Sequence, residues 1–244
     1  MKFIYFAKRN LKEILRDPLS LVLGVILPVS FILLFSTISK NVPLEVFKPV
    51  NIVPGITIFG FTFTTMFLGL LIAKDKSSSF LNRLFISPLK PKDFILGYFI
   101  PMLPFSLIIG ICCLIVGTIV GVPISLALLY TFFSFIPYVL FSAFIGIFLG
   151  TICNETQIMA LGNIYIIASS ILGGAWMDLN ILGKNIKSIT EVLPFSHAIE
   201  ASRIVLSSRL DKMWIHLLIV SIYAIIFFFL SVYFFNKKMK SDNK

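Results

Sequence analysis

Very few side chains in this sequence have the types and spacing that catalysis, metal binding or nucleotide binding requires. Cys112, Cys113 and Cys153 occur without a Cys-x-x-Cys pair of the kind that binds metal. They lie within or at the end of apolar runs, so we expect small buried side chains. The sequence has no Gly-x-x-x-x-Gly-Lys phosphate loop, no His-x-x-x-His pair and no Gly-x-Ser-x-Gly turn. It therefore predicts no catalytic, metal or nucleotide site on this chain.

Ionisable residues are almost absent from the long apolar runs. The exception is His216, which we interpret as an interfacial residue beside Trp214. Ion-driven transporters need ionisable groups at membrane depth, and a membrane-embedded enzyme needs clustered catalytic groups. The pattern disfavours both classes.

The composition points to an integral membrane protein. The chain has 244 residues, of which 58% are hydrophobic and 13% are charged. A soluble domain averages about 45–50% apolar and about 25% charged residues. At about 20 residues per helical span, the chain has room for about six spans.

We expect an all-α membrane fold with six transmembrane helices. The predicted spans cover residues 19–38, 52–73, 94–119, 126–153, 158–176 and 214–235. Residues 1–18 would form a separate N-terminal segment, and residues 19–244 the six-span domain. No small-residue cleavage site follows the first run, so we expect no cleavable signal peptide.

The distribution of Lys and Arg predicts the orientation. Segments 1–18 and 74–93 carry five each and the tail 236–244 carries four, twice as many as the opposite side. By the positive-inside rule both termini are cytoplasmic. The net charge of +10 lies between apolar runs, where it meets lipid headgroups, so we expect no nucleic-acid partner.

Residues 3–18 are expected to form an amphipathic helix at the inner membrane interface. Apolar side chains share one face and mostly basic ones share the other. The apolar set is Phe3, Ala7, Leu11, Ile14 and Leu15, and the polar set is Lys8, Arg9, Lys12, Glu13 and Arg16.

The loop 74–93 is long for a connector and contains a short apolar stretch. This stretch consists of Phe80, Leu81, Leu84, Phe85 and Ile86, and Ser87-Pro88 ends it. Exposed apolar surface in the cytoplasm marks a docking site for a partner. The alternative is that the stretch lies back on the membrane.

The outer segment 177–213 is half apolar. We expect a broken, partly re-entrant hairpin with a break at 193–195 and a short second helix over 198–206. The apolar side chains of its first part recur at near-helical spacing: Ile186, Ile189, Val192 and Leu193.

These segments together resemble the permease subunit of type 2 ABC exporters, in the drug and peptide branch. The resemblance covers the amphipathic start with residues 10–18 (NLKEILRDP), six spans, the charged loop and the outer 193–198 (LPFSHA). Its most specific piece is 81–89 (LNRLFISPL) followed by 91–98 (PKDFILGY), which is the coupling helix in that family. The family motif consists, in order, of an acidic residue, Gly-Thr, an apolar residue and Glu. Here Asp75, Ser78-Ser79 and Asn82 stand at those places, so the carboxylate at 82 is missing.

The resemblance implies that two permease chains pair and that two ATP-binding subunits dock below them. ATP and Mg²⁺ would be bound by those subunits, and this chain would hold no cofactor. The second permease chain would be identical or different. The residues assigned to the contact with the ATP-binding subunit are Arg9, Lys12, Glu13, Phe80, Leu81, Asn82, Arg83, Leu84, Phe85, Ser87 and Pro88.

The second and fifth spans would face the partner permease and line the substrate path. The candidates are Phe61, Thr62, Thr65, Met66, Asn163, Tyr165, Ser169 and Ser170. Interhelical packing is the alternative role for each of them. The pattern Gly146-x-x-x-Gly150 indicates close helix packing, more often within one chain than between two.

We expect an exporter of an amphipathic drug or antimicrobial peptide in a prokaryotic plasma membrane. A polysaccharide, teichoic-acid or lipid-linked substrate is the alternative, although Tyr and Trp, which stack on sugars, are few. A membrane scaffold or membrane-embedded enzyme without an ATP-binding partner is the alternative from another class.

Overall fold

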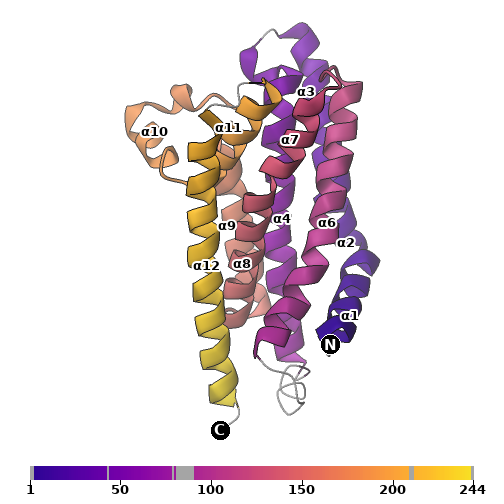
Figure 1. The fold of residues 1–244 in the computed structure, drawn as a ribbon, viewed down its shortest axis with the longest axis vertical. Helices are drawn as coiled ribbons and strands as arrows, with labels where there is room; N and C mark the ends of the chain where they lie inside the picture. Colours follow the sequence, from indigo (N-terminus) through magenta and orange to yellow (C-terminus); the bar gives the residue numbers. More distant parts are fainter. Residues whose placement is uncertain (1–2, 43, 79, 81–90, 209–211, 243–244) are drawn as a thin grey trace.

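The computed structural model describes residues 3–42, 44–78, 80, 91–208 and 212–242. Within these ranges the fold is helical and contains no strand. Figure 1 shows an upright bundle with the N- and C-termini at the same, lower end. In chain order the elements are α1 (Phe3–Arg16), α2 (Pro18–Leu21), the π-helical turn η1 (Val22–Ile26), α3 (Leu27–Asn41), the 3-10 turn η2 (Glu45–Phe47), α4 (Pro49–Ser77), α6 (Pro91–Ile119), α7 (Leu126–Ser134), α8 (Ile136–Ile152), α9 (Glu155–Leu172), the 3-10 turn η3 (Leu179–Leu182), α10 (Lys184–Thr190), α11 (Pro194–Leu206) and α12 (Met213–Asp242).

Five of the six predicted spans lie on helices that are long and apolar enough to cross a membrane. Within the described residues these helices are Pro18–Asn41, Pro49–Ser77, Lys92–Ile119, Leu126–Ile152 and Met213–Lys238. They confirm an all-helical, multi-pass membrane protein. They correspond to the first four predicted spans and to the sixth.

The predicted fifth span corresponds to α9, which is not among these five helices. α9 has 18 residues, and its first turn carries Glu155, Thr156 and Gln157. The apolar part is therefore shorter than the about 20 residues that a span needs. α9 begins sharply because Asn154 and Gln157 form a reciprocal capping box. Its crossing of the membrane stays a prediction.

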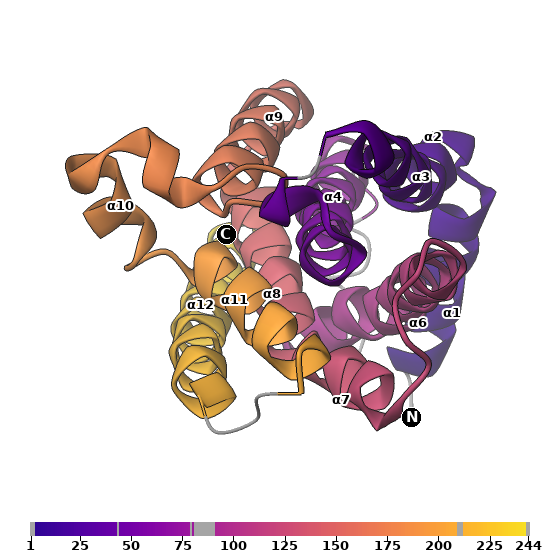
Figure 2. The same ribbon diagram turned by 90° about the horizontal axis from the view of Figure 1, so that it is seen from above.

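α4 is the central helix of the bundle. In its most apolar 18-residue window 94% of the residues are buried, against 17% in Pro18–Asn41 and in Met213–Lys238. Figure 2 shows α3, α6, α8, α9 and α11 around it. A helix that is apolar all round and buried all round belongs inside the protein, whereas the two peripheral helices present apolar faces to lipid.

Glycines on α8 let its backbone approach α4 closely. A Cβ atom added at Gly146 would fall 2.8 Å from the carbonyl oxygen of Thr65, and one at Gly150 would fall 2.8 Å from that of Gly69. Small residues at such crossings stabilise membrane helix pairs through close packing. The prediction that this Gly-x-x-x-Gly pattern serves a contact within the chain is confirmed.

The outer segment differs from the expected hairpin in its second half. α11 begins at Pro194 rather than at 198, because proline suits the first turn of a helix. α11 is largely buried and packs against α4, α7 and α12. Figures 1 and 2 show α10, by contrast, projecting sideways from the upper part of the bundle. Contact of residues 177–193 with the outer leaflet stays a prediction.

Candidate functional site

The described part of the predicted partner interface lies at the lower end of the bundle. Arg9, Lys12 and Glu13 stand on α1, and Phe80 follows α4. Leu81, Asn82, Arg83, Leu84, Phe85, Ser87 and Pro88 lie outside the described residues, so the structure does not test them. The site can nevertheless be built from the segments that adjoin them.

An ion pair joins α1 to the end of α4. The guanidinium of Arg9 donates from Nη1 to Asp75 Oδ2 at 2.6 Å and from Nη2 to Asp75 Oδ1 at 2.7 Å. The Asp75 side chain is only 2% exposed, and that of Arg9 is 36% exposed. Two parallel hydrogen bonds between charged groups are stronger and more directional than a single contact. The position that the family resemblance gave to an acid is thus the anchor of α1.

A second contact brings α6 into the same cluster. The hydroxyl of Tyr98 donates to Asp75 Oδ2 at 2.8 Å, and the fully buried Asn10 donates to the carbonyl of Gly97 at 3.0 Å. The ring of Phe6 lies 4.8 Å from that of Tyr98 in an edge-on arrangement. α1, α4 and α6 therefore meet through satisfied polar groups that are surrounded by aromatic rings. We name Arg9, Asp75 and Tyr98 the lower clamp.

The outer side of the lower clamp is more exposed. Glu13 accepts from Arg9 at 2.8 Å and lies 3.7 Å from the ammonium of Lys74. The guanidinium carbon of Arg9 lies 4.4 Å from the ring centre of Phe80. Burial lowers the pKa of Arg9, but the hydrogen bond and charge of Asp75 and the charge of Glu13 outweigh it, so the pKa is raised overall. Arg9 therefore stays charged.

The structure corrects the predicted faces of α1. Its buried residues are Phe6, Ala7, Asn10 and Ile14, whereas Leu15 is 40% exposed. Asn10 was missed because an amide does not count in an apolar pattern. It is buried because the carbonyl of Gly97 satisfies it.

Two further contacts tie α4 to α8 and α9 at the lower end. The ammonium of Lys76 donates to the carbonyls of Gly150, Thr151 and Cys153 at 3.3, 3.1 and 2.6 Å, which caps the end of α8. Ser77 donates to a carboxylate oxygen of Glu155 at the start of α9. The consecutive residues Asp75, Lys76 and Ser77 at the end of α4 therefore hold four neighbouring helices, α1, α6, α8 and α9.

The predicted path residues separate into two groups. Phe61, Thr62, Thr65 and Met66 on α4 are buried among helices of the same chain, so no surface for a second chain is formed by them here. On α9, Ser169 and Ser170 are buried, Tyr165 is half-buried and Asn163 is exposed.

Residues of both groups make polar contacts with α8. Thr65 donates to the carbonyl of Ser142 at 2.9 Å, and the hydroxyls of Tyr138 and Tyr165 lie 3.2 Å apart. Polar contacts thus join α4, α8 and α9 within the bundle.

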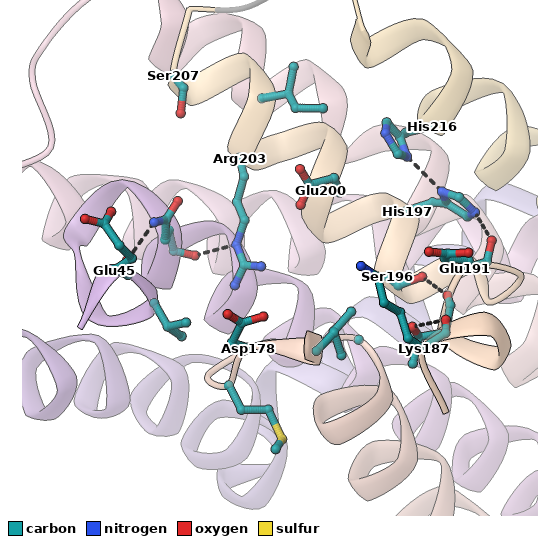
Figure 3. Close-up of a pocket in the computed structure, with 17 residues that line it drawn as sticks. Glu45, Asp178, Lys187, Glu191, Ser196, His197, Glu200, Arg203, Ser207 and His216 are labelled. Atoms are coloured by element: carbon teal, nitrogen blue, oxygen red, sulfur yellow. Dashed lines mark hydrogen bonds between the residues drawn. The ribbon is translucent and has the colours of Figure 1, made fainter. Parts of the chain in front are cut away.

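A cavity of about 490 Å³ lies at the upper end, and Figure 3 shows its lining. Arg203 of α11 donates to the carbonyls of Asn51 at 2.9 Å and Gly174 at 2.7 Å, which links α11 to α4 and to the turn after α9. Burial lowers the pKa of Arg203, and the charges of Glu200 and Asp178 oppose this effect. Within the described residues, no group of three or more His, Cys, Asp or Glu could hold a metal ion.

Two histidines that lie far apart in the sequence meet beside this cavity. The Nδ1 atoms of His197 and His216 lie 2.8 Å apart, and His197 Nε2 lies 2.7 Å from the carbonyl oxygen of Glu191. His216 is therefore a link between α11 and α12, in addition to its place near the exposed Trp214. The two histidines are 19 positions apart, and nothing in the sequence indicated that they would be in contact.

Comparisons with known proteins agree with this architecture. The sequence pattern of the ABC-2 type transporter family matches residues 1–207. The chain is also similar to a protein of Cyanophora paradoxa named "Putative transport permease ycf38", with 24% identity over 214 residues that cover 82% of this chain and 72% of the relative. Membrane subunits of this family lack ATPase activity. The chain belongs to the ABC-2 type transporter family and is a membrane permease.

Proposed function

We propose that this permease is the membrane subunit of an ATP-driven exporter with two permease chains and two ATP-binding subunits. ATP and Mg²⁺ belong to those subunits. Both termini lie in the cytoplasm of a prokaryotic cell, and α9 provides the sixth crossing. The common lower position of the two termini in Figure 1 supports an even number of crossings.

The observation that carries the coupling role is the lower clamp. It ties α1 to the helix that precedes loop 74–93 and to the helix that follows it. A subunit docked on this loop and on α1 would push three helices as one body. The contact through Lys76 extends this connection to α8. Movement at the cytoplasmic side would thus reach α4, the helix that touches most of the bundle.

The exposure of Asn163 is the observation that supports pairing with a second permease chain. It is exposed near the middle of α9, on the side where Ile164 and Ile167 are 63% and 59% exposed. An amide that faces hydrocarbon is costly unless another polar group satisfies it. A second copy or a related permease packed on α9 would supply that group. Asn163→Leu should weaken pairing of the chains, and Ile167→Leu on the same face is the control.

The proposed substrate is an amphipathic drug or antimicrobial peptide. The buried polar side chains of the described membrane helices are mainly hydroxyls, and Asp75 is the acid among the buried residues. Such an interior suits an apolar or weakly polar surface better than a highly charged glycan. Transport into inside-out vesicles of a labelled amphipathic peptide, compared with a lipid-linked glycan, tests this assignment.

Co-purification tests the exporter assignment. We would express the chain with its genetic neighbours, purify it in mild detergent, identify the bound proteins and measure vanadate-sensitive ATP hydrolysis. Leu84→Arg places a charge in the predicted coupling helix and should abolish retention of the ATP-binding subunit. Ile124→Arg is the matched control, because Ile124 is 86% exposed at the upper end of the bundle.

The co-purification results distinguish the exporter proposal from its alternatives. An ATP-binding subunit that is retained by the wild type and the control, but lost from Leu84→Arg, supports the proposal. Recovery of the wild type without such a subunit, under conditions that preserve a known ABC complex, would refute it. The scaffold and membrane-enzyme interpretations would then lead.

A further inference from the structure

A basic groove runs along α1 where this helix meets the first span. Its volume is about 720 Å³. The basic side chains that line it are Lys8, Arg9, Lys12, Arg16 and Lys74. Two acids, Glu13 and Asp17, also line it.

The two acids are engaged inside the protein. Glu13 is bound by Arg9, and Asp17 caps α2 by accepting from the backbone and hydroxyl of Ser20 at 3.0 and 2.5 Å. Among the side chains that the structure describes, no acid forms an ion pair with Lys8, Lys12 or Arg16. The groove lining therefore carries three more cations than acids.

Three exposed apolar side chains stand directly beside lining residues in the sequence, and we call them the apolar border of the groove. Ile4 is 45% exposed, Leu15 40% and Leu19 57%. With 3.6 residues per turn, Ile4 and Leu15 form a strip directly beside Lys8. Tyr5, which is 81% exposed, belongs to the lining itself. Tyrosine favours the level of lipid headgroups, because its ring is apolar and its hydroxyl is polar.

We propose that this groove binds the headgroup of an anionic phospholipid, with the phosphodiester on Lys8, Lys12 and Arg16 and the acyl chains along Ile4, Leu15 and Leu19. The three cations attract the single negative charge of the phosphodiester, and long basic side chains reach it while their methylene groups rest on apolar surface. The position at the bend between α1 and a membrane helix places the groove at headgroup level. The site goes beyond the proposed exporter function, because it requires neither a substrate nor an ATP-binding subunit.

The apolar border decides the choice of ligand. A soluble phosphate would use the cations alone and would leave Ile4, Leu15 and Leu19 in water. Only an amphiphile satisfies both parts of the groove. The apolar border therefore favours a lipid over a free anion, and the place of the groove at headgroup level beside the first span favours a lipid over a protein segment.

The experiment compares lipid binding by two charge-matched variants of the full chain. Native mass spectrometry in detergent measures the association constant of the first phosphatidylglycerol, with phosphatidylcholine of the same chains as reference. The test variant is Lys8→Gln/Arg16→Gln, which leaves Lys12 in place because Lys12 is also a predicted contact with the ATP-binding subunit. The control is Lys40→Gln/Lys212→Gln, which removes two exposed charges near the upper end.

Each basic side chain near an anionic surface contributes about fivefold in affinity, so the test variant should bind phosphatidylglycerol about thirtyfold more weakly. The control should stay near the wild type, and phosphatidylcholine binding should not change. If the double variant does not fold, Lys8→Gln alone should lose about fivefold.

Three results would overturn the proposal. The first is equal binding of the two lipids by the wild type. The second is displacement of phosphatidylglycerol by millimolar inorganic phosphate. The third is a test variant that keeps the lipid but loses the ATP-binding subunit, which would make the groove a protein contact.

Discussion

Replacing Asp75 by Asn removes the acceptor that holds α1 on the bundle. The substitution keeps the size of the side chain and abolishes its charge. The guanidinium of Arg9 then keeps only Glu13 as a charged partner, and Tyr98 donates to a neutral amide. We expect α1 to open from α4 and α6 more often while the rest of the bundle stays folded.

The size of the effect follows from burial. Removing one partner of a fully buried ion pair costs about 3–5 kcal/mol. Arg9 is partly exposed and regains some hydration when the pair is broken. We therefore expect a loss of about 2 kcal/mol, which is roughly a thirtyfold increase in the opening equilibrium of α1.

The assay is hydrogen exchange of the α1 amides in the reconstituted chain, read as a double-mutant cycle. The cycle uses Arg9→Gln, Asp75→Asn and the double variant, and we expect a coupling energy of about 1–2 kcal/mol. Glu45 and Lys48 supply the control, because their ion pair has the same 2.6 Å separation but side chains that are 78% and 58% exposed. An exposed pair should couple by less than about 0.5 kcal/mol in the exchange of its own segment.

The reasoning is refuted if the two pairs couple equally. Burial would then not be what makes the lower clamp strong. An unchanged exchange rate of α1 in Asp75→Asn would likewise show that the aromatic contacts of Phe6 hold the helix without the ion pair.

Further substitutions test the packing of the bundle. Gly97→Ala places a Cβ atom 2.1 Å from Phe6 and should destabilise the docking of α1 by about 1–3 kcal/mol in the same exchange assay, whereas Gly110→Ala, whose nearest contact is 3.4 Å, should be tolerated. Arg203→Met leaves two backbone carbonyls unpaired and should lower the thermal unfolding midpoint in detergent; a midpoint equal to the wild type would contradict the link between α11 and α4. Lys76→Met should increase exchange at the end of α8, with a loss of about 1 kcal/mol, and unchanged protection there would exclude the capping role.

Hydropathy and charge were sufficient to predict the class of the protein. Runs of apolar residues place five spans correctly, because a helix in lipid must satisfy its backbone within itself. The same signal is weak for α9, whose sequence mixes Gln157, Asn163 and hydroxyls with apolar residues. The start of α11 was mispredicted because Pro194 can begin a helix as readily as it can end one, whereas its end at Leu206 was predicted correctly.

The lower clamp could be predicted only in part. The position of Asp75 was identified by resemblance and Arg9 by the amphipathic pattern, but nothing in the sequence pairs residues that are 66 positions apart. Tyr98 and Asn10 gave no polar signal, since one is aromatic and the other lies on an apolar face. The burial of Phe61 and Thr62 within the chain was also not predicted. A span that is apolar all round gives no sequence pattern from which its buried side could be identified.

The central position of α4 has a consequence for how the protein is made. A helix that ends up enclosed by five others must first enter the bilayer before most of them have been synthesised. Three of its four threonines are satisfied at that stage, because Thr57 donates to the carbonyl of Val53 at 2.7 Å, Thr62 donates to that of Phe59 at 2.6 Å, and Thr64 bonds its own helix in the same way. These three hydroxyls are satisfied before the later helices are made, which lowers the cost of holding α4 in lipid until then. The later helices then pack around it and add polar contacts, such as those of Thr65 with Ser142 and of Asp75 with Tyr98.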